Sequence, residues 1–254
     1  MRTMLIGDGQ RAGAWRNRAR DLGFTAMLAV QCLIIFAIPF AAMGYEGLRE
    51  VVALLFFIFT FLVCLIAPGR VATIFAILAF ISGLTGYVLE RVEPSTTIAL
   101  VLVFIGAVSA FVVATYALGY ATLAPGRVTF HRVLGAIALY LNIGLMFGAI
   151  YRMIWYFIPN SLTNIPGNAG WSAYGQILYI SFVTLTSTGF SDIVPVHPIT
   201  RMLVNVEAII GQLYPATLLA RLITLELRGE RWRARKRLRL NRHERITQPS
   251  LAWK

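Results

Sequence analysis

The chain has 254 residues, of which 58% are hydrophobic and only 13% are charged, and its formal net charge is +12 at pH 7. Because soluble domains carry about 25% charged residues, this composition excludes a soluble enzyme domain and predicts a membrane protein. The basic residues gather in the terminal segments and in short turns, a distribution that marks membrane topology and not nucleic-acid binding.

The N-terminal segment, residues 1–21, is basic and precedes the apolar stretch 22–43. That stretch is longer than the apolar core of a signal peptide, which has about 7 to 15 residues. We therefore expect a cytoplasmic N-terminal segment followed by a retained first membrane helix.

Six apolar stretches are long enough to cross the roughly 30 Å hydrocarbon layer of a bilayer. They cover residues 22–43, 51–67, 71–89, 97–124, 133–158 and 201–227. The predicted fold class is thus an all-α membrane protein with six transmembrane helices per subunit. An even number of spans, together with the basic turns, places both termini in the cytoplasm. We expect a cell membrane, the bacterial inner membrane.

The first four helices, residues 22–124, are expected to form a scaffold. Residues 97–124 contain no charged side chain, whereas a voltage sensor needs several, because each charge gains only about 2.3 kcal/mol per 100 mV. This scaffold therefore lacks the charges of a voltage sensor.

The predicted pore domain, residues 131–228, contains a segment that is neither a full span nor an ordinary loop. Residues 171–185 are mostly apolar, but such a helix is only about 22 Å long and has to stop inside the membrane. The polar residues 186–192 then begin at membrane depth, where irregular backbone has to be buried or to line a water-filled path. Exposed carbonyls there, together with the negative end of a helix dipole, favour a cation.

The string T-L-T-S-T-G-F-S-D at residues 184–192 resembles T-x-T-T-V-G-Y-G-D, the filter of the potassium channel superfamily. Thr184, Thr186, Gly189 and Asp192 match that pattern outright. The residues after the filter and the last apolar stretch are similar to those of bacterial ion-channel members, so that the resemblance covers roughly residues 133–227.

The resemblance implies a pore helix at 171–185, a filter at 186–192 and an inner helix at 201–227, with four identical subunits around one axis. It also implies passive K⁺ conduction, without enzyme activity or a cofactor. Four residues would supply the carbonyls that bind K⁺: Ser187, Thr188, Gly189 and Phe190. The whole ion-conducting filter would be Thr186, Ser187, Thr188, Gly189, Phe190 and Ser191.

Two departures from the family pattern concern the support of the filter. Phe190 replaces the filter Tyr, and its partner position is the apolar Ile180; losing both members of a hydrogen bond together can be nearly neutral. Tyr179 replaces a pore-helix Trp, and its hydroxyl can still donate to Asp192. The alternative for Tyr179 is an aromatic side chain at the membrane interface.

Two further departures concern the ion path itself. Thr188 replaces an apolar Val, so its hydroxyl needs a partner. Ser191 replaces a Gly whose conformation costs other residues about 1 to 2 kcal/mol. These changes leave a weakly selective K⁺/Na⁺ channel as the alternative to a K⁺-selective one.

The inner helix carries one acidic residue at membrane depth, Glu207, which is a functional candidate by position. It either contacts ions or braces the back of the filter through hydrogen bonds. Further along, a bend and a gate are expected, with ordinary helix packing as the alternative for the gate. The residues concerned are Gly211, Gln212, Tyr214, Pro215 and Leu218.

The cytoplasmic tail, residues 229–254, is strongly basic. A basic cluster next to a membrane attracts anionic lipid, although it can also act only as a topology anchor. The lipid-contact candidates are Arg233, Arg235, Lys236 and Arg237. A membrane transporter or a non-conducting scaffold subunit are the remaining alternatives for the whole chain; a transporter usually shows broken helices in both halves.

Overall fold

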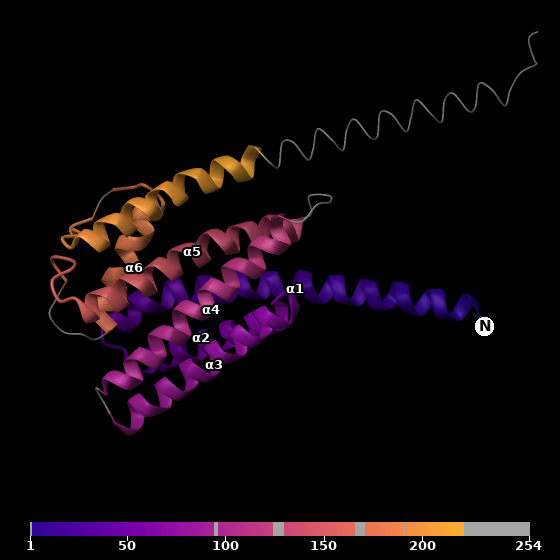
Figure 1. Ribbon diagram of the computed structural model, residues 1–254, viewed down its shortest axis with the longest axis horizontal. Helices are drawn as coiled ribbons and strands as arrows, with labels where there is room; N and C mark the ends of the chain where they lie inside the picture. The colour runs from indigo at the N-terminus through magenta and orange to yellow at the C-terminus, as the bar shows by residue number, and fades with distance from the viewer. Residues whose placement is uncertain (1, 94–95, 124–129, 166–170, 190, 221–254) are drawn as a thin grey trace, which may run out of the picture.

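The computed structural model describes residues 2–93, 96–123, 130–165, 171–189 and 191–220, and this part of the chain is all-helical apart from its connections (Figure 1). The helices are α1 (Arg2–Ala42), α2 (Glu46–Ile66), α3 (Gly69–Val92), α4 (Thr97–Leu123), α5 (Phe130–Phe157) and α6 (Trp171–Leu185). A further helix, described over Pro198–Ala220, is called the inner helix below. The predicted all-α fold class is confirmed.

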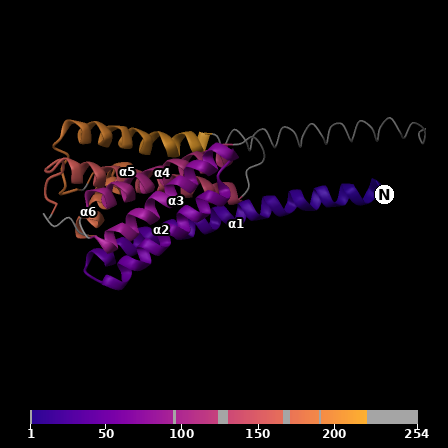
Figure 2. The ribbon, with the colours of Figure 1, turned by 60° about the horizontal axis from the view of Figure 1, so that its bottom comes forward.

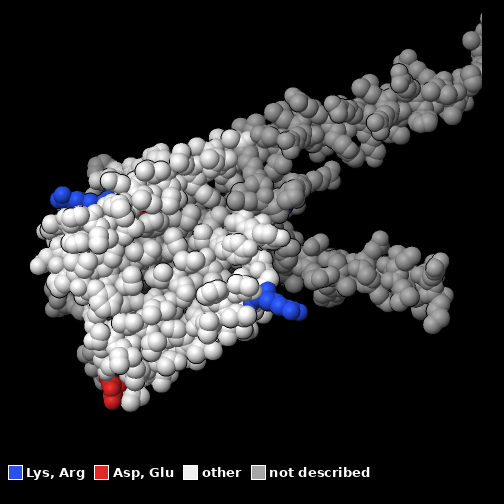
Figure 3. Space-filling model, viewed as in Figure 1, with Lys and Arg blue, Asp and Glu red and all other residues white. Residues whose placement is uncertain are grey.

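Six of these helices are long and apolar enough to cross a membrane: every one except α6, which has 15 residues. The face seen in Figure 3 is almost free of charged side chains, which lie at its ends. The chain is therefore a multi-pass membrane protein.

Most helices extend a few residues beyond the predicted apolar stretches; for example, α2 begins at Glu46 and not at residue 51. α1 begins at Arg2, so that the basic segment is part of the first helix. This part of α1 extends beyond the bundle (Figures 1 and 2). The inner helix begins at Pro198, three residues before the predicted start, and Pro is well suited to a first helical position because its missing N–H is not needed there.

Glycine brings α3 and α4 into backbone contact. A Cβ at Gly106 would lie 2.6 Å from the Gly83 nitrogen, and a Cβ at Gly86 would lie 2.8 Å from the Ala99 carbonyl oxygen. Small residues of this kind let membrane helices approach closely. The two helices thus form a tight hairpin within the scaffold.

A buried polar network joins the scaffold to α5. Gln31 on α1 donates to Asn142 Oδ1 at 3.1 Å, and Asn142 Nδ2 donates to the Phe111 carbonyl at 2.9 Å and to Thr115 Oγ1 at 2.8 Å. Gln31 and Asn142 are fully buried. Interhelical hydrogen bonds such as these replace the hydrophobic effect, which is absent between helices in lipid, so the network holds α1, α4 and α5 together.

Candidate functional site: the pore module

The short helix α6 lies between α5 and the inner helix, at the end of the bundle that carries the α5–α6 connection (Figures 1 and 2). Two glycines on α5 make room for it. A Cβ at Gly144 would lie 2.8 Å from the ring of Phe182, and one at Gly148 would lie 2.9 Å from Leu178. Their spacing, small-x-x-x-small, is the pattern that allows close helix contact in membranes.

The carboxyl end of α6 leads into the predicted filter through a left-handed residue, Ser187, whose φ is 55°. The Thr188 N–H donates to the Val183 carbonyl and the Ser187 N–H donates to the Thr184 carbonyl, both at 3.0 Å. This pair of bonds is a Schellman motif, in which glycine usually takes the left-handed position. A serine there costs about 1 to 2 kcal/mol, so the turn is held by its surroundings.

A tyrosine from α5 satisfies the carbonyl of Leu185, the last residue of α6. The Tyr140 hydroxyl donates to it at 3.0 Å. The same carbonyl touches the inner helix, where a Cβ at Gly211 would lie only 1.9 Å from its oxygen. Gly211 is therefore required by close packing, in addition to the predicted role in a bend, and three elements meet at the end of α6.

The predicted filter residues Thr186 to Gly189 are exposed on the surface of the chain. The predicted need of Thr188 for a hydroxyl partner is met by Thr186, with the two oxygens 2.7 Å apart, and Thr186 also donates to the Phe182 carbonyl at 2.7 Å. Gly189 has a φ of 75°. Phe190, a predicted K⁺ ligand through its carbonyl, lies outside the described residues.

Beyond the filter, the chain is tied to the α5–α6 connection. The Thr163 N–H donates to the Val194 carbonyl at 3.0 Å, and Asn164 Nδ2 donates to the Asp192 carbonyl at 2.6 Å. Ser191 Oγ bonds within its own turn, to the main chain of Ile193 at 3.1 Å. The segment after the predicted filter is thus tied to the α5–α6 connection by hydrogen bonds from both backbone and side-chain donors.

The hydrogen bond from the Tyr179 hydroxyl to Asp192 stays a prediction. Its side chain is 47% exposed on α6, and Asp192, its predicted partner, is also exposed. Ile180, the position opposite the filter aromatic, is buried with 3% exposure. The apolar surroundings of Ile180 are compatible with the paired loss of polar groups expected there.

Glu207 of the inner helix is fully buried and has hydrogen-bond partners on both α5 and α6. Tyr151 of α5 donates to its Oε2 at 2.6 Å, and Ser181 of α6 donates to its Oε1 at 2.6 Å. Ser181 also lies 2.8 Å from the Gly144 carbonyl, which it can bond instead. Because both carboxyl oxygens have partners, this arrangement favours a brace over an ion ligand.

Further along the inner helix, Tyr214 contacts α5. Its hydroxyl donates to the Ala136 carbonyl at 2.7 Å, and its ring stacks on that of Tyr140 with 5.6 Å between centroids. Gln212 and Pro215 are exposed, and Leu218 is half-buried. These contacts favour ordinary helix packing over a gate as the role of Tyr214 in this conformation.

In addition to Phe190, the four predicted lipid-contact residues lie outside the described part of the chain: Arg233, Arg235, Lys236 and Arg237. Their contact with anionic lipid stays a prediction.

Sequence reasoning missed three residues that build the site: Tyr140, Tyr151 and Ser181. Each is a polar side chain within an apolar helix, and that was the available signal, because such groups need partners in the membrane. The second signal was the Gly144-x-x-x-Gly148 spacing on α5, which marks the surface where α6 packs.

A 15-residue helix between two helices long enough to cross a membrane, followed by an exposed polar loop, resembles the pore module of an ion channel. Residues 139–227 match the family model of ion channels, which confirms the resemblance for this part of the chain. No curated protein and no solved structure matches the chain.

Proposed function

We propose that the chain is one subunit of a homotetrameric channel that conducts K⁺ passively through the carbonyls of Ser187, Thr188, Gly189 and Phe190. The observation that carries the proposal is the exposed filter at the end of α6. Polar backbone at membrane depth needs a water-filled path, and rings of carbonyls can replace the hydration shell of a cation. The proposed membrane is the bacterial inner membrane, with both termini in the cytoplasm.

The inner helix supports an assembly of several subunits. Only 11% of the most apolar 18-residue stretch of the inner helix is buried within the chain, compared with 61% for the corresponding stretch of α5. Large apolar side chains are exposed along it, namely Met202, Val206, Ile209, Leu213 and Leu219. One chain also supplies a single filter segment, whereas a carbonyl ring needs several. Neighbouring subunits would cover the exposed inner helix and would supply the other filter segments.

The gating of this channel would not use a charged sensor helix, because α4 contains no charged residue. A weakly selective K⁺/Na⁺ channel is the second candidate. It is favoured by the hydroxyl pair of Thr186 and Thr188, because this pair places polar side chains where the family has an apolar one.

The test is ion flux into liposomes that contain the purified full-length protein, measured for K⁺ and Na⁺ with and without Ba²⁺. We expect K⁺ flux that Ba²⁺ blocks. Equal flux of the two ions would support the weakly selective channel. Flux that requires a second, coupled ion would support a transporter, and the absence of flux from folded protein would support a non-conducting subunit.

Two glycine substitutions provide a matched control. Both Gly189 and Gly47 have open space around the position of a Cβ, but only Gly189 has a positive φ. Gly189→Ala should abolish flux or K⁺ selectivity, because Ala strains the filter backbone by about 1 kcal/mol or more. Gly47→Ala should leave both unchanged, and an equal effect of the two substitutions would contradict the assigned filter.

A further inference from the structure

A cavity of about 570 Å³ lies between the scaffold and the pore module. Its lining includes residues of α2, α3 and α4 from the scaffold, together with Arg152 of α5 and Tyr174 of α6. A volume of this size is typical of sites for small molecules, about 300 to 1,000 Å³. It lies apart from the filter and takes no part in the proposed ion path.

One end of the cavity is charged. Three arginines line it, Arg49, Arg91 and Arg152, against two acidic residues, Glu50 and Glu90, so one positive charge is in excess. All five lie near the helix ends at the side of the bundle where α6 begins. This end therefore lies near the membrane surface, where a charged group can enter from water.

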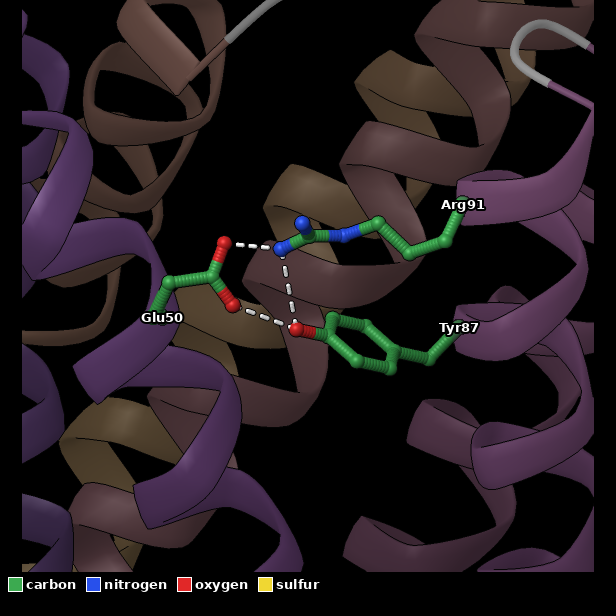
Figure 4. A network of polar contacts seen from close by, with 3 residues as sticks. All are labelled: Glu50, Tyr87 and Arg91. Carbon is green, nitrogen blue, oxygen red and sulfur yellow. Dashed lines mark hydrogen bonds and ion pairs between the residues drawn. The ribbon is translucent and has the colours of Figure 1, made fainter.

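Two of the three arginines have partners. Arg91 forms an ion pair with Glu50, and both bond the Tyr87 hydroxyl (Figure 4). Arg152 lies over the ring of Tyr174, 5.0 Å from its centroid, and interacts electrostatically with Glu90. The acidic residues are thus engaged by these two arginines.

Arg49 carries the excess charge. Its Nε is buried, yet it has no hydrogen-bond partner among the described residues. A buried donor without a partner is costly, and more so when it is charged. An anion in the cavity would satisfy it.

The other end of the cavity is apolar. Phe56 of α2 and Phe104 and Phe111 of α4 line it. Leu100 and Phe111 both line the cavity, and the helix between them is about 16 Å long. The cavity thus runs from a cationic end near the membrane surface to an aromatic end about halfway through the roughly 30 Å hydrocarbon layer.

We propose that this cavity binds a single-chain amphiphile with one anionic head group, such as a fatty acid. The head group would accept hydrogen bonds from Arg49, and the chain would pack against Phe56, Phe104 and Phe111. The single excess charge fits one anion, and the volume fits a small molecule better than a two-chain phospholipid. The site is independent of the proposed conduction.

The test is photolabelling of the full-length protein, in nanodiscs of phosphatidylcholine, with a stearic acid that carries a diazirine in its chain. Labelled residues are mapped by mass spectrometry. We expect label on α2 around Phe56 and on α4 between Phe104 and Phe111. An excess of palmitate should displace it, whereas hexadecanol, with the same chain and no charge, should not.

Three variants make this test specific. Arg49→Gln should reduce labelling about tenfold at subsaturating probe, which is the loss of one charge-assisted hydrogen bond. Arg70→Gln is the matched control, because Arg70 is exposed at the opposite end of α3 and should leave labelling unchanged. Ala107→Phe, which fills the apolar end, should abolish labelling without touching the charge.

Several outcomes would overturn the proposal. Labelling that is equal in Arg49→Gln and Arg70→Gln, or equal competition by hexadecanol, would show simple partition into apolar surface. Label spread over lipid-facing positions such as Ile74 and Leu78 would show the same. Loss of labelling in phosphatidylglycerol nanodiscs, without competition by palmitate, would assign the cavity to a membrane phospholipid.

Discussion

Two clusters of charged and polar residues among the helices differ in how completely the described residues satisfy them. Around Glu207, inside the pore module, both carboxyl oxygens have partners and the side chain is fully buried. Arg49 lines the cavity between the scaffold and the pore module, and its buried Nε has no hydrogen-bond partner among the described residues. The first cluster is complete within the chain, whereas the second is completed by the proposed ligand.

This comparison predicts that substitutions in the pore module destabilise the protein far more than substitutions at the cavity. The largest effect is expected for Gly211→Ala. A Cβ there would lie 1.9 Å from the Leu185 carbonyl oxygen, and backbone cannot give way cheaply. We expect a loss of about 3 kcal/mol in the free energy of unfolding, measured by denaturant titration in mixed micelles.

Gly119→Ala serves as the control for Gly211→Ala, because Gly119 is also within a membrane helix but has only one atom near its Cβ position, at 4.0 Å. Its stability should change by less than about 1 kcal/mol. Similar losses from the two substitutions would mean that α6 and the inner helix are not in close contact.

Glu207→Leu is expected to have the second largest effect. It removes the partner of the Tyr151 hydroxyl, whereas Ser181 can still bond the Gly144 carbonyl, and leaving a buried hydroxyl unpaired costs about 1 to 3 kcal/mol. We expect a loss of about 2 kcal/mol in unfolding free energy, together with reduced ion flux in liposomes.

Glu207→Gln sharpens the same test. The Gln oxygen can accept from Tyr151, and its NH₂ can donate to Ser181, whose own hydrogen then bonds the Gly144 carbonyl. Stability and conduction should therefore stay near those of the unmodified protein. If Glu207→Gln removed conduction while the protein remained stable, Glu207 would be an ion contact and not a brace.

Tyr140→Phe should have a smaller effect. It leaves the Leu185 carbonyl without its hydroxyl donor but preserves the ring that stacks on Tyr214. The expected loss is about 1 kcal/mol, with a measurable change in K⁺ over Na⁺ permeability because the end of α6 leads directly into the filter. Tyr116→Phe, at an exposed position on α4, is the control and should change neither quantity.

The smallest effect on stability is expected at the cavity. Arg49→Met removes a buried donor that has no partner among the described residues, so the unfolding free energy in the absence of added amphiphile should stay within about 0.5 kcal/mol or rise. A loss as large as that of Glu207→Leu would show that Arg49 already has a partner in the assembled protein and would erase the contrast between the two clusters.

The spans and the position of the pore module were accessible from the sequence, because the length of an apolar stretch and its flanking turns depend on neighbouring residues only. The apolar stretch 171–185 is visibly too short to span, and the polar residues after it are local as well. Basic residues 1–21 gave no such signal, and α1 nevertheless begins at Arg2.

The partners within the site could not be predicted, because they come from distant parts of the chain. Glu207 meets Tyr151 and Ser181 across three helices, and nothing near Glu207 in the sequence specifies either. Backbone strain was expected at Ser191 from the family pattern. The structure shows a left-handed serine at Ser187, which follows from how α6 ends and not from the filter letters alone.

The stacked rings of Tyr140 and Tyr214 link the end of α6, where the predicted filter begins, to the inner helix. Tyr140 fastens the last carbonyl of α6, and Tyr214 fastens the inner helix to α5 one turn beyond Gly211. The predicted bend of the inner helix at Gly211 would have to slide one ring across the other. We therefore expect the contact between the two rings to couple the predicted gate region of the inner helix to the end of α6.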